Sequence, residues 1–142
     1  MKRSLSFLTA EHVVTMHDAL LDQFGGLAGG GPRGGSFEGV DAAVQAVRNS
    51  YYETVEELAA AYAVYLVQGH VFLDGNKRAG AAAMLTFLAA NGVSVGIPPE
   101  DLASMMIDLQ RRSEAGEDAT RLIQHIASKL ARRAGPRTPH MR

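Results

Sequence analysis

Between residues 70 and 78 the chain gathers side chains that are suited to phosphate chemistry. His70 is a candidate general base, because a neutral imidazole can take a proton from a hydroxyl near neutral pH. Asp74 is a candidate magnesium ligand, since a carboxylate can hold this ion on phosphate oxygens. Lys77 and Arg78 place two cations beside these groups. The combination indicates a site that holds a nucleotide phosphate.

The two cations stand where a helix is expected to begin. Gly75 and Asn76 are typical of a turn or helix start, because glycine tolerates unusual backbone angles and Asn or Asp caps free amides. Residues 77–88 are Ala-rich with apolar positions at helical spacing, which predicts a helix with Lys77 and Arg78 in its first turn. Cations there cost about 0.3–1 kcal/mol each. An anion facing the turn amides, the helix dipole and both cations would explain that cost.

A plainer interpretation of the same residues stays open. A His-x-x-x-Asp pair such as His70 and Asp74 is often a helix cap and a surface acid. The Asn-Lys-Arg run is also compatible with a solvated helix start. The density of polar groups between two strongly apolar segments favours the functional interpretation.

The string from His70 to Arg78 matches the pattern His-x-Phe-x-Asp-Gly-Asn-Lys-Arg. It resembles the Fic/Doc family, and specifically its Doc (death-on-curing) branch. Supporting similarity covers a little over half the chain, from about Leu8 to Gly92. It includes Leu8-Thr9-Ala10-Glu11, Phe24-Gly25-Gly26, Glu57-Leu58-Ala59-Ala60, Phe87-Leu88 and Asn91-Gly92.

The resemblance implies an enzyme that uses ATP and Mg²⁺ to modify a protein hydroxyl. Carried over by position, His70 is the expected general base and Asp74 the expected Mg²⁺ ligand. The expected nucleotide contacts are the anion hole and the phosphate-binding cations, namely Gly75, Asn76, Lys77 and Arg78.

One position separates the two branches of the family. Adenylylating relatives usually carry Gly where this chain has Lys77, and a second Arg where it has Ala81. A long cation at residue 77 is expected to reverse the nucleotide, so that its γ-phosphate faces the acceptor. The resemblance therefore implies a Doc-like toxin kinase that phosphorylates a hydroxyl, expected to be a Thr of elongation factor Tu, and thereby blocks translation.

Two other functions remain open from the sequence. The chain could be a Fic-like protein adenylyltransferase despite Lys77, or a non-catalytic module that only binds a phosphate or nucleotide. One departure from Doc-like sequences is also present, since Ala79-Gly80 stands where Thr-Ala is common.

The self-restraining segment of some Fic relatives is not supported here. Its pattern, Ser/Thr-x-x-x-Glu-Gly, is approached at Glu38-Gly39, but Gly34 occupies the position of the required hydroxyl. A Doc-like chain without this segment is expected to depend on a separate, cognate antitoxin that covers an apolar groove near the site.

Composition favours a single compact domain. With 142 residues and 46% hydrophobic content, the chain can bury a core of its own. Its 14 basic and 15 acidic side chains give no nucleic-acid footprint, so no direct nucleic-acid partner is expected. The absence of Cys removes disulfides and thiolate zinc sites. No signal peptide or membrane span is evident, so we expect a cytoplasmic protein that does not contact membranes.

Helical periodicity recurs along the chain and predicts an all-α fold, a compact bundle of about six helices. Thr9 is expected to cap the first helix, and Thr54 and Glu57 to form a capping box before the helix that leads to His70. A second helix is expected at about residues 39–50, and Asn91-Gly92 should end the motif helix. Residues 4–7 hint at one short N-terminal strand.

The chain is expected to divide into a Fic/Doc-like helical domain over residues 1–134 and a disordered tail over 135–142. Residues 25–39 are glycine-rich and formally contain a G-x-G-x-x-G string. No strand precedes that string and Pro32 lies within it, so a loop near the site is expected rather than a dinucleotide fold.

Overall fold

The computed structural model describes residues 5–24, 37–69 and 75–135 of the chain. Within these residues the protein is all-α, as predicted. Its six helices are α1 (Ala10–Phe24), α2 (Phe37–Arg48), α3 (Val55–Gln68), α4 (Asn76–Ala90), α5 (Pro99–Glu114) and α6 (Ala119–Arg133). None of the described helices has both the length and the apolar character that crossing a membrane requires.

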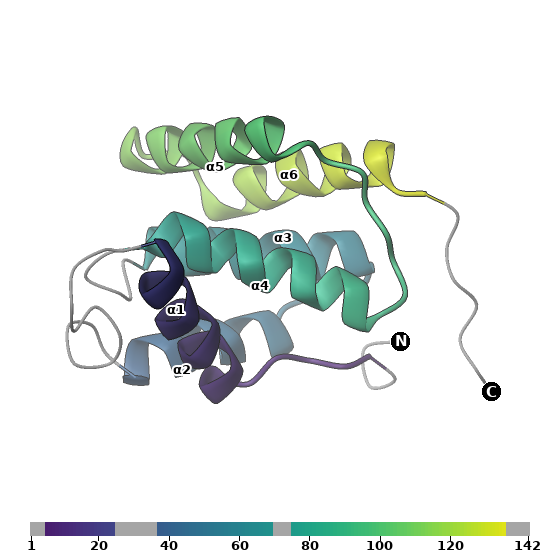
Figure 1. Ribbon diagram of the computed structural model, residues 1–142. Coiled ribbons are helices and arrows are strands. Elements are labelled where there is room, and N and C mark those ends of the chain that lie inside the picture. The colour runs from purple at the N-terminus through teal and green to yellow at the C-terminus, as the bar shows by residue number, and fades with distance from the viewer. Residues whose placement is uncertain (1–4, 25–36, 70–74, 136–142) are drawn as a thin grey trace.

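The helices stack in layers around α3 and α4 (Figure 1). Helices α5 and α6 lie side by side as one layer above α3 and α4, and α1 and α2 lie on the other side. The most extensive packing is that of α3 with α4, and α3 also packs on α2, α5 and α6. Helix α3 is buried along almost its whole length, which suits a sequence that is apolar on every face. It forms the core on which the motif helix α4 rests.

The start of α3 is fixed by the predicted capping box. Thr54 Oγ1 accepts a hydrogen bond from the Glu57 amide at 3.1 Å, and Glu57 Oε1 accepts one from the Thr54 amide at 3.3 Å. The other carboxylate oxygen of Glu57 accepts from Gln124 of α6 at 2.9 Å. This hydrogen bond from Gln124 lowers the pKa of Glu57, with the capping contacts adding to the effect. One carboxylate therefore caps α3 and ties it to α6.

The predicted N-terminal strand is wrong for its described residues. Residues 5–7 belong to no strand. Their backbone is satisfied by a side chain instead: the Ser6 amide donates to Asn91 Oδ1 at 2.8 Å, and Asn91 Nδ2 donates to the Ser6 carbonyl at 3.0 Å. The amide of Asn91 thus takes the role that a partner strand would have had.

Other boundaries follow their sequence signals. Thr9 Oγ1 accepts from the His12 amide at 3.2 Å, so Thr9 caps α1 as expected. Asn91 is the C-cap of α4, and Gly92 follows with a positive φ of 80°. Helix α2 begins and ends two residues earlier than expected, at Phe37 and Arg48.

The segment between α4 and α5 returns to the end of α6. Val95 and Ala134 form an isolated antiparallel bridge, and the Gly135 amide donates to the Ser94 carbonyl at 2.9 Å. Gly135, the first residue of the predicted tail, is therefore attached to the domain by its backbone. The rest of that tail and most of the glycine-rich segment, residues 25–36, lie outside the described residues.

Candidate functional site

The predicted site residues divide into two groups. His70 and Asp74, the expected general base and metal ligand, lie outside the described residues. The four expected nucleotide contacts are described, and they come from one place, the beginning of α4: Gly75, Asn76, Lys77 and Arg78. The geometry of the site is therefore built from this helix start and from the helices that pack against it.

Gly75 makes the turn that starts α4. Its φ of 83° and ψ of 18° lie in the left-handed region, which glycine adopts without the steric cost that a Cβ adds. Its carbonyl accepts the first hydrogen bond of the helix, from the Ala79 amide at 2.9 Å. Gly75 has no side chain with which to cap α4, so the expected capping by Asn or Asp does not come from the N-cap residue itself. The positive end of the helix dipole lies at this turn.

Lys77 and Arg78 share one hollow between α4 and α5. Its volume is about 320 Å³. The two cations stand at its polar side, and the rest of the wall is mostly apolar: Ala81, Pro99, Leu102, Ala103, Met106 and Ile107. Both cations therefore line one cavity. Such an arrangement suits a ligand that combines an anionic group with an apolar or aromatic part.

Lys77 is hydrogen-bonded to α5. Its Nζ donates to Gln110 Oε1 at 2.5 Å, and Gln110 Nε2 donates to Glu114 Oε2 at 3.0 Å. Lys77 and Gln110 are both partly buried. The cation is thus directed toward the neighbouring helix by a neutral amide, and that amide is in turn oriented by a carboxylate one turn along.

Gly80 explains how closely α4 approaches its neighbours. A Cβ at this position would lie 3.2 Å from Met106 Cε, 3.3 Å from the Ala63 carbonyl oxygen and 3.3 Å from Val67 Cγ2. These distances are tighter than ordinary van der Waals contact. The departure from Doc-like sequences at Ala79-Gly80 therefore has a packing reason: both residues are fully buried or nearly so, and glycine lets α3 and α5 reach α4.

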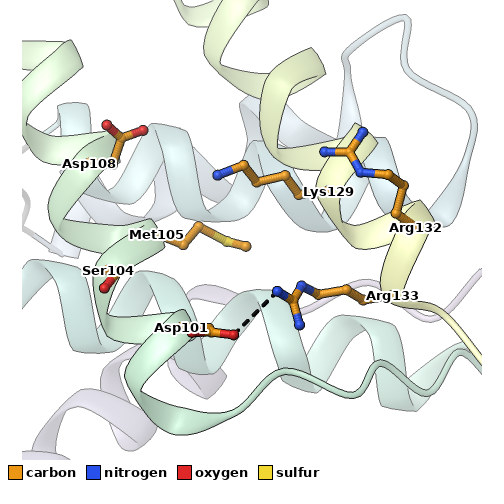
Figure 2. Close-up of a pocket in the computed structure, with 7 residues that line it drawn as sticks. All are labelled: Asp101, Ser104, Met105, Asp108, Lys129, Arg132 and Arg133. Carbon is orange, nitrogen blue, oxygen red and sulfur yellow. Dashed lines mark hydrogen bonds and ion pairs between the residues drawn. The ribbon is translucent and has the colours of Figure 1, made fainter.

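A second cavity, of about 430 Å³, lies between α5 and α6 (Figure 2). Its side chains are mostly charged: Asp101, Ser104, Met105, Asp108, Lys129, Arg132 and Arg133. Arg133 Nη2 contacts Asp101 Oδ2 at 3.2 Å across the cleft, and Lys129 reaches from α6 toward α5. Cations in the last turn of α6 also complement the negative end of the helix dipole. This cleft is a charged seam between two helices, and it holds none of the predicted site residues that the structure describes.

The histidines of α1 do not form a metal site. His12 Nδ1 accepts a hydrogen bond from the Thr9 amide at 3.1 Å, so it belongs to the helix cap. His17 is completely buried, with Asp18 Oδ1 3.6 Å from its Nδ1. Among the described residues no group of three or more His, Asp or Glu side chains is placed to hold a metal ion.

The family model described as Fic/DOC family matches residues 7–88, which is more than half the chain. The chain belongs to the Fic/DOC family. Within the family it is similar to the protein kinase doc of Escherichia phage P1, with 34% identity over 130 residues, or 90% of this chain and 95% of that protein. The resemblance of residues 70–78 to Doc-type sequences is thereby confirmed.

The match to the Fic/DOC family model ends before α5, and the site residues predicted from the sequence also lie before that helix. Gln110 and Glu114, which reach Lys77 from α5, were missed. The available signal was their spacing, because a Gln and a Glu four residues apart on a helix can hydrogen-bond to each other. Nothing in the sequence paired that Gln with Lys77, since the two lie 33 positions apart and meet only when α4 packs on α5.

Proposed function

We propose that this Doc-like protein is a kinase that transfers the γ-phosphate of ATP to a hydroxyl of a protein. The observation that carries the proposal is the hollow at the start of α4, where Lys77 and Arg78 stand beside an apolar wall. Adenosine triphosphate has the matching pair of features, an anionic chain and an aromatic base. The relative named protein kinase doc supports the same class of reaction.

The residue roles follow the family pattern. His70 would accept the proton of the attacking hydroxyl, Asp74 would hold Mg²⁺ on the phosphates, and Gly75 and Asn76 would border the anion. Magnesium supplies charge neutralisation on the phosphate oxygens when it is bound. The protein's own contribution is position and positive charge, because phosphoryl transfer demands little covalent chemistry from side chains.

The cations of α4 favour phosphorylation over adenylylation. Lys77 occupies the position that is usually Gly in adenylylating relatives, and the position of their second Arg is Ala81. Ala81 lines the same hollow as Lys77 and Arg78, so the wall is apolar where that second cation would stand. This arrangement supports a reversed nucleotide whose γ-phosphate, rather than its α-phosphate, faces the acceptor.

The remaining parts of the proposal concern partners and place of action. We infer that the acceptor is a Thr of a translation factor such as elongation factor Tu, in the cytoplasm, and that its modification blocks translation. A cognate antitoxin would neutralise the protein. We expect no direct contact of this protein itself with nucleic acid or membrane.

Labelled ATP tests the reaction directly. The protein is incubated with Mg²⁺, a cytosolic extract and ATP labelled in either the γ- or the α-phosphate. Label transferred to a protein from the γ-position supports the kinase, and label from the α-position supports an adenylyltransferase. ATP binding without any transfer would indicate a binding module.

The variant His70→Ala separates catalysis from binding. Removal of a positioned general base lowers transfer by about 10²–10⁴-fold. His125→Ala is the matched control, because His125 lies on α6, outside the family match, and is partly exposed. Equal transfer by wild type and His70→Ala would overturn the assigned role.

A further inference from the structure

We propose that Gln110 and Glu114 of α5 are positioning residues for the nucleotide, acting through Lys77. The proposal rests on the proposed function in one respect, namely that Lys77 contacts a phosphate of ATP. It extends the site beyond the family motif and onto a helix that the Fic/DOC model does not cover.

The contact chain has one possible orientation. Lys77 Nζ can only donate a hydrogen bond, and an ionised Glu114 can only accept one. The amide between them must therefore turn its oxygen to Lys77 and its nitrogen to Glu114, as the distances of 2.5 Å and 3.0 Å show. Glu114 thus determines which face of the Gln110 amide meets the cation.

A neutral acceptor leaves the charge of Lys77 available. A carboxylate in place of Gln110 would neutralise the ammonium and compete with a phosphate for it. The amide oxygen restricts a long, flexible side chain while preserving its full positive charge. An ammonium has three protons, and among the described residues only Gln110 is hydrogen-bonded to one of them, so phosphate oxygens can take the others.

Helix packing holds the pair in register. Lys77 and Gly80 lie three residues apart on α4, and Met106 and Gln110 lie four apart on α5, so each pair shares a helix face. The approach at Gly80, where Met106 Cε is 3.2 Å from the place of a Cβ, therefore aligns Lys77 with Gln110 one turn away. Lys77 and Met106 also line the same hollow, which places the hydrogen-bonded cation at the wall of that cavity.

Three substitutions separate the roles of charge and orientation. Gln110→Glu introduces a competing anion and should weaken Mg·ATP binding about tenfold or more, with a matching rise in KM. Gln110→Leu releases Lys77, and Glu114→Gln lets the amide invert; each should weaken binding about threefold to tenfold. Binding is measured by calorimetry with Mg·ATP, and transfer with γ-labelled ATP.

Gln45→Glu is the matched control for the change in charge. Gln45 is exposed on α2, which lies away from the α4–α5 hollow. The Gln45→Glu variant should bind Mg·ATP with the same affinity as wild type. Thermal melting of every variant checks the fold, and the ¹⁵N signal of the Lys77 ammonium reports the hydrogen bond itself: slow proton exchange in wild type should be lost in Gln110→Leu.

The outcomes distinguish this inference from the proposed function. Mg·ATP binding within twofold of wild type in both Gln110 variants would overturn the positioning role, even if the protein is a kinase. Weakened binding in those variants, together with no phosphoryl transfer by wild type, would support the positioning role and overturn the kinase. A wild-type protein that binds no Mg·ATP would overturn both.

Discussion

The α4–α5 junction and the α5–α6 cleft both present cations, but they give them different partners. At the junction Lys77 meets a neutral amide, that of Gln110. In and beside the cleft two arginines meet carboxylates: Arg133 contacts Asp101 at 3.2 Å, and Arg112 contacts Glu117 at 2.6 Å. The same helix, α5, takes part in both arrangements.

The difference teaches how a cation kept for a ligand can be recognised. An arginine paired with a carboxylate has its charge balanced within the protein, so its role is to join helices. A lysine held by an amide keeps a net positive charge beside a cavity, and an anion can complete its coordination. Cavity size alone would point to the charged cleft of Figure 2, which is the larger of the two cavities described above, whereas the partner of the cation points to the α4–α5 hollow.

The sharpest test of this contrast exchanges Lys77 at the junction and Arg112 beside the cleft for Met. Lys77→Met should lower phosphoryl transfer by about 10²-fold, as loss of a charged group facing the transferred phosphate does. Arg112→Met should leave transfer within about twofold, because its guanidinium is engaged by Glu117 and Asp108. Initial rates with γ-labelled ATP measure both, and equal losses would break the distinction between the regions.

Packing at the junction gives the next largest effect. Gly80→Leu should lower the free energy of unfolding by about 1–3 kcal/mol, because the side chain must displace Met106, Val67 and the Ala63 carbonyl. Gly80→Ala is the graded comparison: its helix propensity is better by about 1 kcal/mol, which offsets part of the crowding. Urea unfolding measures both. A stable Gly80→Leu protein would show that α5 is not held close to α4.

In the charged cleft the expected effect is smaller. Asp101 and Arg133 are both substantially exposed, and exposed pairs contribute about 0–1 kcal/mol. A double-mutant cycle with Asp101→Asn and Arg133→Met should give a coupling energy in that range, and the coupling should fall in high salt. A coupling energy well above this range, or one that does not change with salt concentration, would mean that the cleft does more than join α5 to α6.

The smallest effect is a pH dependence at the end of α5. The hydrogen bonds from Arg112 hold the pKa of Glu117 below its ordinary value of 4.5. The folded protein therefore binds this proton less readily than the unfolded chain, so the pair stabilises above about pH 4.5, and that stability is lost as the pH falls through the lower, folded pKa. Melting temperatures should fall on acidification slightly less for Glu117→Gln than for wild type. Parallel pH profiles would contradict the lowered pKa.

Much of the fold could be predicted because its signals are local. The capping box of Thr54 and Glu57 fixed the start of α3, and Asn91-Gly92 fixed the end of α4. The strand expected at residues 4–7 was wrong for its described part, residues 5–7, and for a long-range reason: the Ser6 backbone finds its partner in the side chain of Asn91, 85 residues away. Periodicity does not report such pairings.

The candidate site also has features that local sequence signals predict and features that depend on long-range packing. The left-handed turn at Gly75 and the helix that begins at Asn76 follow from residue types alone. The direction of the Lys77 side chain does not follow from residue types, because it depends on a hydrogen bond to Gln110 on another helix. The two helices approach closely where Met106 packs against Gly80. Sequence reasoning singled out Lys77 and Arg78 as a pair of cations, but it identified neither the α5 wall of the hollow that they line nor the amide that directs Lys77.

The short connection from α4 to α5 also determines where mechanical load would fall. It holds Ser6 through Asn91 and Gly135 through Ser94, so opposite flanks of the domain are fastened to one four-residue stretch. Tension applied through a tag or tether beyond either flank would reach this stretch first, at the far end of α4 from Gly75. Immobilising the protein by these flanks should therefore leave the start of α4 undisturbed.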